Sequence, residues 1–227
     1  MRVSGTWTGD AEAERLVESV WQDERTTRSD LVNGPVFVVV TCGVNAITVV
    51  ASDYRHLLAR LRRPHAAGLA TIRPLAVTGV LVCPDGVVLG RRAATVSQGP
   101  GRWEPAPAGG VDRPDPTAVV LDELREELGL TVGDVTTVEP LGILEELATG
   151  VHDIVFRLCT PRTATEIGRA HRTQGSAEYD EVTVVAVDEL AGFLAGHGLL
   201  ASAAPMLALA GLLDPPEAGS DRRPPVG

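Results

Sequence analysis

The first third of the chain combines one helical pattern with short strand-like runs. Apolar side chains recur at three- and four-residue spacing over 10–24, which predicts an amphipathic helix. Two runs rich in valine and isoleucine, 36–40 and 47–51, predict a pair of strands. A second helix is expected after them, and Pro64 ends it. Together these patterns predict a small N-terminal α/β extension over 1–70.

The pattern changes in the middle of the chain. Apolar runs at 77–82 and 87–90 are separated by a Pro-Asp-Gly sequence, which signals a hairpin turn. A Gly/Pro-rich segment and one strongly marked helix follow. Three later runs have strand character, at 141–144, 154–158 and 182–187. Strands, then a helix, then strands again predict an α+β domain over 71–213.

The end of the chain carries two further helical patterns and a tail. Residues 188–194 predict a short helix, and the Ala/Leu-rich segment 203–213 predicts a terminal one. The last residues, 214–227, are rich in Pro, Gly and charge, which predicts a flexible tail. The terminal helix and the leading β unit are candidates either for packing on each other or for a homodimer interface.

The central helix has the clearest boundaries in the chain. Asp115 is a suitable cap, and Pro116 suits a first helical position that needs no amide hydrogen. Gly129 suits the left-handed residue that ends a helix. Four aliphatic residues form its expected buried face, namely Val120, Leu121, Leu124 and Leu128.

The opposite face of this helix is crowded with negative charge. Glu123, Glu126 and Glu127 stand at i, i+3 and i+4, where like charges repel by a few tenths of a kcal/mol per pair. A hard cation such as Mg²⁺ would turn this repulsion into ligation, because it prefers carboxylate and phosphate oxygens. Mn²⁺ shares these oxygen ligands and is the alternative metal. The structural alternative is a solvated acidic face.

Composition and charge narrow the choice of partners. The 227 residues include 30 acidic and 20 basic ones, a formal net charge of −10, which argues against nucleic acid or an anionic membrane as a partner. The three cysteines are scattered and odd in number, which argues against a disulfide framework or a zinc site. No apolar run approaches the roughly 18 residues that a membrane-spanning helix needs. We therefore expect a cytoplasmic protein with a small-molecule partner.

The glycine pair and the central helix resemble the Nudix box, G-x5-E-x7-R-E-U-x-E-E-x-G-U, in which U is aliphatic. Gly109 and Gly110 precede the run E-L-R-E-E-L-G-L at 123–130, and this run matches the distal half of the box completely. The proximal half is degenerate. Its Arg, Glu and leading Gly are replaced by Asp122, Pro114 and Ala108.

The substitutions in the proximal half concern the loop rather than the acidic helix face. The Nudix family pairs the replaced Arg and Glu structurally, and this pairing holds the loop against the helix. Their joint loss implies a reshaped loop, for which Asp115 and Pro116 are an alternative source of rigidity. The change bears on the placement of the helix carboxylates, and so on which of them is a ligand and which is a base.

The order of segments beyond the box is similar to that of the UDP-glucose/UDP-galactose diphosphatase branch of the family. That branch also has an extra N-terminal unit and a non-standard box. The similar segments are 52–55, 74–79, 89–92, 140–143 and 177–179. The resemblance implies a Nudix α/β/α sandwich with a mixed sheet, preceded by the N-terminal extension.

The resemblance also implies a reaction and its metal site. The expected reaction is Mg²⁺-dependent hydrolysis of the pyrophosphate bond of a nucleoside-diphosphate sugar, giving a nucleoside monophosphate and a sugar 1-phosphate. Glu123 and Glu127 map onto the family's metal ligands, and Glu126 is a further ligand or the base. A backbone carbonyl of Gly109 or Gly110 would complete the metal shell.

Candidate substrate-binding residues come from three other segments. Arg91 and Arg92 end a predicted strand, and either one is a candidate phosphate ligand. Glu104 follows a tryptophan, as in the family's W-E pair before the glycines. Glu178 is the candidate late-loop acid, and the other candidates are Glu181, Glu145 and Glu146. Solvent-exposed charge is the structural alternative for each of these acids.

Two other functions compete with the diphosphatase. One is a biosynthetic Nudix enzyme that acts on a different diphosphate or without hydrolysis, which the loss of the box Arg motivates. The other is a catalytically silent Nudix-like ligand-binding domain. The retained acidic trio argues against the silent domain, because a protein that only binds has no need of three crowded carboxylates. Turnover of a substrate panel separates the three.

Overall fold

The computed structural model describes residues 1–29, 31–43, 46–96 and 98–214. Apart from its first residue, the predicted flexible tail lies outside these residues. No helix in the described ranges is both long and apolar enough to cross a membrane.

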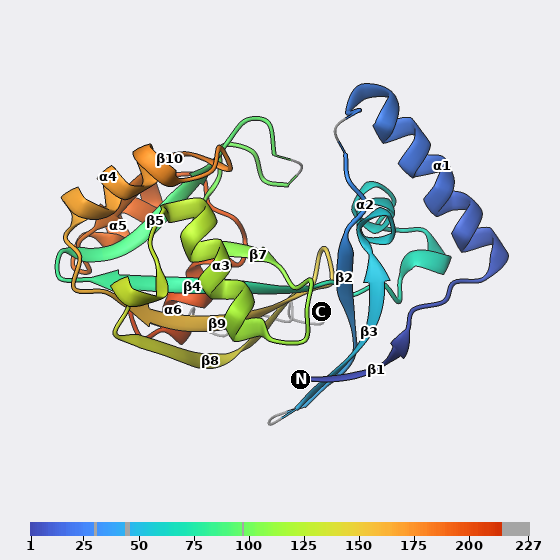
Figure 1. The fold of residues 1–227 in the computed structure, drawn as a ribbon, viewed down its shortest axis with the longest axis horizontal. Coiled ribbons are helices and arrows are strands. Elements are labelled where there is room, and N and C mark those ends of the chain that lie inside the picture. Colours follow the sequence, from blue (N-terminus) through green and yellow to red (C-terminus); the bar gives the residue numbers. More distant parts are fainter. Residues whose placement is uncertain (30, 44–45, 97, 215–227) are drawn as a thin grey trace, which may run out of the picture.

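The N-terminal unit is a three-stranded sheet with two helices on one face (Figure 1). Its elements are β1 (Arg2–Thr6), α1 (Ala11–Thr27), β2 (Pro35–Cys42), β3 (Ile47–Asp53), α2 (Tyr54–Arg62) and the 3-10 turn η1 (Ala67–Leu69). The strand order is β1-β3-β2, with β1 parallel to β3 and β2 antiparallel to it. Both predicted helices and both predicted strands are present. Strand β1 was not predicted, because its five residues are all exposed and carry no apolar alternation.

The main domain is an α/β/α sandwich around a mixed sheet. Its strands are β4 (Leu75–Cys83), β5 (Gly86–Arg92), β6 (Trp103–Pro105), β7 (Ala108–Gly110), β8 (Thr137–Glu146), β9 (Val151–Cys159) and β10 (Tyr179–Val185). Its helices are α3 (Pro116–Leu128), α4 (Ala164–Gln174), α5 (Leu190–Gly196) and α6 (Ala203–Leu209), with a 3-10 turn η2 (Val132–Asp134). The strand order is β10-β5-β4-β9-β8, in which β4 and β9 are parallel. The predicted α+β class and layered architecture are confirmed.

The sheet opens between β4 and β5, and this opening positions the site. The two strands pair with each other only next to their hairpin turn, through Val82–Val87 and Cys83–Gly86. Beyond that point β6 pairs with β5 and β7 pairs with β4. The short strands fill the gap in the segment predicted only as Gly/Pro-rich. Three-residue strands have no periodicity of their own, so they follow from the divergence of their neighbours.

The two units share one hydrophobic core. Alternate residues of β2 point to opposite faces of its sheet. Val38 packs with α1 and α2, whereas Phe37 and Val39 belong to the cluster that includes Val77 and Leu124 of the main domain. The backbone is joined as well, because the Phe37 N–H donates to the Val111 carbonyl at 3.1 Å. The N-terminal sheet therefore covers part of the main core.

Helix α3 begins and ends at the predicted residues. The Asp115 carboxylate accepts hydrogen bonds from two first-turn amides, Pro116 follows it, and Gly129 adopts φ 67° at the C-terminus. The buried face differs from the prediction at two positions, because Val119 is buried and Leu121 is only partly so. A Cβ on Gly129 would lie 2.6 Å from the Ala170 carbonyl oxygen, so α4 packs closely against this turn.

We expect Gly129→Ala to lower the free energy of unfolding by about 1–2 kcal/mol from the left-handed conformation alone. The contact with the Ala170 carbonyl adds to this cost. Gly192→Ala is the control, because Gly192 is helical with open space around it and alanine should stabilise it by about 0.5–1 kcal/mol. Urea denaturation measures both variants. Equal stability of Gly129→Ala and the wild-type protein would contradict the close packing of α3 on α4.

Candidate active site

Two carboxylates of α3 lie against the short strand β7. Glu127 is 1% exposed, and its Oε2 accepts a hydrogen bond from the Ala108 N–H at 2.9 Å. Its other oxygen, Oε1, is buried without a hydrogen-bond partner. Glu123 approaches the next residue of the strand so closely that a Cβ on Gly109 would lie 1.9 Å from its Oε1. Glycine at 109 is therefore required for the backbone to meet this carboxylate.

Burial and mutual repulsion make both carboxylates hold their protons unusually tightly. Burial raises the pKa of Glu123 to about 7, and the charges of Glu178 and Glu126 add to this effect. Burial likewise raises the pKa of Glu127 well above its usual value, with Glu178 and Glu123 as the next causes. Glu178 comes from the loop before β10 and acts on both residues. The three carboxylates thus form one region of concentrated negative charge, which a cation would stabilise.

The other predicted members of the metal site are placed less tightly. The Glu126 side chain is 57% exposed, and its Oε1 accepts a hydrogen bond from Arg125 at 2.8 Å. Gly110 has open space where a Cβ would stand, so no close contact demands glycine there. The structure therefore brings Glu123, Glu127 and Gly109 together and leaves Glu126 and Gly110 at the border of the site.

The donor set suits a hard divalent cation completed by a substrate. Within the described ranges, no three acidic, histidine or cysteine side chains are arranged so that they could hold a metal ion by themselves. Mg²⁺ is usually held by only one or two protein carboxylates, with water and substrate phosphates filling the other positions. The unpartnered Oε1 of Glu127 and the carboxylate of Glu123 beside the Gly109 backbone meet this requirement.

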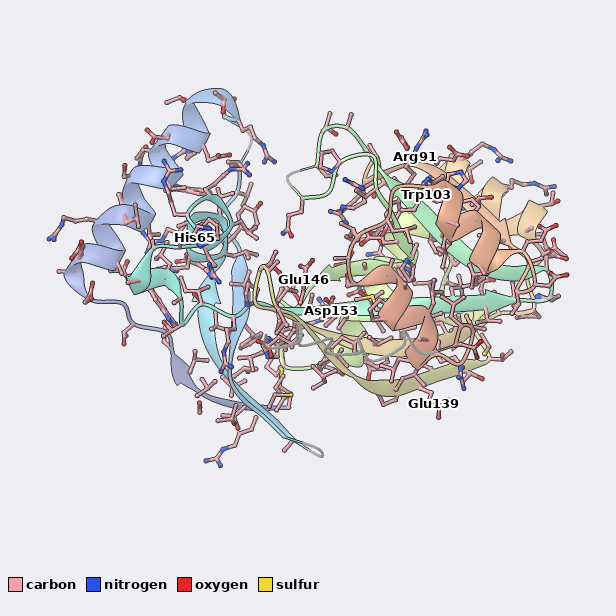
Figure 2. All side chains as sticks on the ribbon, turned by 180° about the vertical axis from the view of Figure 1, so that it is seen from behind. His65, Arg91, Trp103, Glu139, Glu146 and Asp153 are labelled. Carbon is pink, nitrogen blue, oxygen red and sulfur yellow. The ribbon has the colours of Figure 1, made fainter. Side chains whose placement is uncertain are left out.

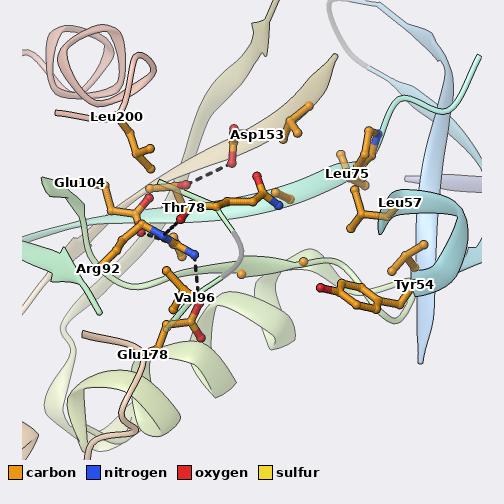
Figure 3. Close-up of a pocket in the computed structure, with 18 of the residues that line it drawn as sticks. Tyr54, Leu57, Leu75, Thr78, Arg92, Val96, Glu104, Asp153, Glu178 and Leu200 are labelled. Atoms are coloured by element: carbon orange, nitrogen blue, oxygen red, sulfur yellow. Dashed lines mark hydrogen bonds and ion pairs between the residues drawn. The ribbon is translucent and has the colours of Figure 1, made fainter. Parts of the chain in front are cut away.

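A cavity of about 810 Å³ opens between the two units of the chain (Figure 3). Tyr54 and Leu57 of α2 line it on the side of the N-terminal unit. Gly109 lines it on the side of the main domain, together with Arg92 and Glu104. The metal candidates Glu123 and Glu127 do not line the cavity themselves, but both contact the β7 backbone that does, Glu123 at Gly109 and Glu127 at Ala108. The contribution of α2 to the cavity was not foreseen from the sequence.

Arg92 is the centre of a polar network at the wall of this cavity. Its guanidinium donates hydrogen bonds to Glu104, to Glu178 at 3.3 Å and to the Gln98 carbonyl at 2.8 Å. The Tyr179 hydroxyl donates to Glu104 at 3.1 Å. Burial alone would lower the pKa of Arg92, but the ion pair with Glu104 outweighs it and the pKa is raised. Arg92 is therefore a fixed, fully charged group.

Arg91 lies elsewhere, because successive residues of a strand face opposite ways. It pairs with Asp180 at 2.8 Å and with Glu181 at 3.2 Å, and it lies over the Trp103 ring at 5.8 Å. Figure 2 shows Arg91 beside Trp103, apart from Glu146 and Asp153. Of the predicted substrate-binding residues, Arg92, Glu104 and Glu178 line the cavity, whereas Arg91 does not.

An ion pair that the sequence analysis missed holds the loop before α3. Arg113 donates to the Asp122 carboxylate and, at 3.1 Å, to the Ala118 carbonyl. Asp122 stands where the box has Arg, and Arg113 is next to the position where the box has Glu. Compared with the box, the acid is now on the helix and the Arg in the loop, and an ion pair still joins the loop to the helix. The signal in the sequence was an opposite-charge pair next to two substituted positions.

A second buried acid also faces the cavity. Asp153 on β9 accepts a hydrogen bond from the Thr78 hydroxyl of β4 at 3.2 Å, as Figure 3 shows. Burial raises its pKa to about 7, and the charges of Glu104 and Glu146 add to the effect. The neighbouring His152 faces the other way, with its Nδ1 3.0 Å from the Gly150 carbonyl. From the sequence, Asp153 is a candidate only together with His152, either as a dyad or as the polar end of a strand. The structure instead pairs Asp153 with Thr78 and places the His152 ring near the Gly150 carbonyl.

Comparison with known proteins identifies the main domain. A family model described as NUDIX domain matches residues 73–204. The comparison with curated proteins gives no match. Three solved structures illustrate the structural similarity. DR0079 from Deinococcus radiodurans has a TM-score of 0.47 and 18% identity, and the match covers 59% of this chain and 80% of that one.

The NUDIX domain of Shewanella oneidensis NrtR, complexed with ADP ribose, has a TM-score of 0.47 and 16% identity, and the match covers 60% of this chain and 84% of that one. A C. elegans Ap4A hydrolase has a TM-score of 0.40 and 19% identity, and the match covers 60% of this chain and 94% of that one.

We expect Asp153→Asn to remove a pH-dependent cost of folding. The pKa of an aspartate is about 4 in an unfolded chain and about 7 for Asp153 in the folded protein. A raised pKa means that stability is fully present below about pH 4 and is lost as the pH rises through about 7. The variant should therefore gain on the order of 3 kcal/mol relative to the wild-type protein between pH 4 and pH 8. Urea denaturation in EDTA measures the difference.

Asp134→Asn is the matched control for this prediction. Hydrogen bonds from the Thr131 backbone and side chain, then from Arg162, lower the pKa of Asp134. A lowered pKa means that the stability is present above about pH 4 and is lost on acidification below it. The effect of Asp134→Asn should therefore stay constant between pH 5 and pH 8. A pH-independent effect of Asp153→Asn over the same range would show that Asp153 titrates normally.

Proposed function

Because the chain belongs to the Nudix family of pyrophosphohydrolases, we propose that it hydrolyses a nucleoside-diphosphate sugar, with UDP-glucose as the first candidate. The products are a nucleoside monophosphate and a sugar 1-phosphate. The observation that carries the proposal is the close approach of Glu123 to Gly109 beside the buried, half-partnered Glu127. This arrangement lies at the wall of a cavity large enough for a substrate of two joined parts.

Mg²⁺ is the proposed cofactor, with Mn²⁺ as the alternative. Glu123 and Glu127 would hold it, with the Gly109 carbonyl as the backbone ligand. When bound, the metal supplies neutralisation of phosphate charge and lowers the pKa of water. Glu126 is exposed at the border of the same patch and either completes the ligand set or takes the proton of the attacking water. Glu178 adds negative charge that favours cation binding.

The reaction requires one bond to form and one to break. The oxygen of a water molecule bonds to one phosphorus of the pyrophosphate, and the bridging oxygen leaves with the other phosphate. A carboxylate of the site takes up the proton that water releases. Arg92 faces the cavity with a fixed positive charge and is the proposed ligand of a phosphate oxygen. Glu104 orients Arg92 through their ion pair.

The cavity supports a substrate with two different ends. Tyr54 and Leu57 give it an apolar and aromatic wall, which suits the face of a nucleobase. Asp153 and Thr78 give it a polar wall some way from that surface, as Figure 3 shows. A pyrophosphate between the two ends would lie near Arg92 and the β7 backbone.

A substrate panel tests the proposal directly. The purified protein is incubated with Mg²⁺ and UDP-sugars, ADP-ribose, dinucleoside polyphosphates and nucleoside triphosphates, and the products are identified by mass spectrometry. UMP and sugar 1-phosphate are the expected products. Cleavage of another panel member keeps the mechanism and rejects the UDP-sugar. If the protein binds Mg²⁺ or Mn²⁺ but cleaves nothing, a specialised biosynthetic diphosphate becomes the better hypothesis. If it neither cleaves nor binds metal, a silent ligand-binding domain does.

We expect Glu127→Gln to lower kcat by at least 100-fold and to abolish the increase in Tm that Mg²⁺ gives the wild-type protein, because the amide removes a charged ligand. Circular dichroism checks that the fold is kept. Glu139→Gln is the control, since Glu139 lies on β8 away from the site and is 54% exposed (Figure 2). An active Glu127→Gln protein with unchanged metal affinity would exclude Glu127 as a ligand.

Glu126→Gln separates the two roles open to that residue. As a ligand, Glu126 contributes to metal affinity, so its loss should raise the Mg²⁺ concentration at half-maximal activity. As the base, it should leave that concentration unchanged and lower kcat with loss of the acidic limb of the pH profile. Wild-type values of both quantities would exclude Glu126 from the mechanism.

A further inference from the structure

The proposed hydrolysis makes no use of Asp153, although it is one of the most deeply buried acids of the chain. The residue is 8% exposed, and its carboxylate accepts a hydrogen bond from the neutral Thr78 hydroxyl. The charged groups that act on it from neighbouring strands are Glu104 of β6 and Glu146 of β8, both of the same sign. In the described residues, no Arg, Lys or His forms a salt bridge with it. A buried acid in these surroundings destabilises the fold.

The sheet would accept apolar residues at both positions. Asp153 is paired in register with Ala76 of β4, and Thr78 is two residues further along the same face. The next residues of this face, Val80 and Val155, are buried in an apolar cluster. The polar pair therefore stands at the end of an apolar strip, at the point where the strip meets the cavity. Both side chains line that cavity.

The surroundings restrict what the pair can bind. A carboxylate accepts hydrogen bonds, and a threonine hydroxyl that donates to it still has lone pairs to accept with. Glu104 and Glu146 also line the cavity and would repel a phosphate group. Arg92, the proposed phosphate ligand, forms its ion pairs with Glu104 and Glu178 rather than with Asp153. The pair thus favours uncharged groups that donate hydrogen bonds, and neighbouring hydroxyls on a sugar ring match this requirement.

We propose that Asp153 and Thr78 form a subsite for a sugar ring of the substrate, in which Asp153 accepts hydrogen bonds from ring hydroxyls. This inference rests on the proposed function, since it names the part of a nucleoside-diphosphate sugar that the polar wall of the cavity holds. Two rings have the required hydroxyls, the transferred sugar and the ribose of the nucleoside. The pair determines specificity and takes no part in bond cleavage.

The test compares three ligands that differ in their hydroxyls. UDP-glucose has both rings complete, UDP methyl ester lacks the transferred sugar, and 2′-deoxy-UDP-glucose lacks a ribose hydroxyl. The variants are Asp153→Asn and the nearly isosteric Thr78→Val. Asp134→Asn is the control, because Asp134 also accepts a hydrogen bond from a threonine hydroxyl, that of Thr131 at 2.7 Å, but does not line the cavity.

For each site variant, we expect kcat/KM for UDP-glucose to fall roughly 10- to 100-fold, mainly through KM, since hydrogen bonds to a charged group are among the stronger ones. If the subsite holds the transferred sugar, hydrolysis of UDP methyl ester should be unchanged. If it holds the ribose, both variants should lose activity on UDP-glucose and UDP methyl ester and react with 2′-deoxy-UDP-glucose as the wild-type protein does. The Asp134 control should discriminate among the ligands as the wild-type protein does.

Equal losses on all three ligands, or a fall confined to kcat, would overturn the subsite. Binding by calorimetry, with Mg²⁺ present, keeps this outcome apart from failure of the proposed function. If the wild-type protein binds the ligands without cleaving them, binding still tests the subsite. The wild-type protein should then prefer UDP-glucose, and the Asp153→Asn variant should lose this preference. Failure of the wild-type protein to bind any of the three overturns both the subsite and the UDP-sugar assignment.

Discussion

Negative charge buried behind a strand of three residues is the constraint around which the site is arranged. Glu123 and Glu127 lie between α3 and β7, where burial opposes their ionisation and Glu178 adds repulsion. The structure holds them there by backbone contact, through the Ala108 N–H and the bare Cα of Gly109. Both contacts exist only because β4 and β5 diverge and leave room for β6 and β7. The opening of the sheet and the chemistry of the helix are thus parts of one arrangement.

The loop before α3 shows how this arrangement survives changes in the box. The box has an Arg on the helix that pairs with an acid of the loop, and this chain has Asp122 in place of that Arg. Arg113 of the loop supplies the positive charge that pairs with Asp122. The pair is solvent-exposed, so its contribution to stability is small. Its value is geometric, because it joins the loop to the helix at the residue directly before Glu123, the carboxylate that lies against Gly109.

Local signals in the sequence predicted the elements that local signals determine. Asp115, Pro116 and Gly129 delimit α3 correctly because capping acts within a few residues. Strands β6 and β7 are three residues long and owe their conformation to pairing with distant strands, so no local sequence pattern predicts them. The choice between Arg91 and Arg92 depended on which face of β5 meets the cavity, and this follows from the packing of the sheet. The α2 wall of the cavity likewise depends on how two distant segments come together.

The continuity of the core has a consequence for the ancestry of the chain. The family match begins at residue 73, yet Phe37 and Val39 complete the hydrophobic cluster behind β4 and α3. The N-terminal sheet is therefore no removable appendage, since its loss would uncover that cluster and open one side of the cavity. A residue changed in α2 alters the same cavity as one changed in β9, so selection on what this cavity binds would act on both units. The two segments are expected to have been inherited as one unit and to have diverged in step.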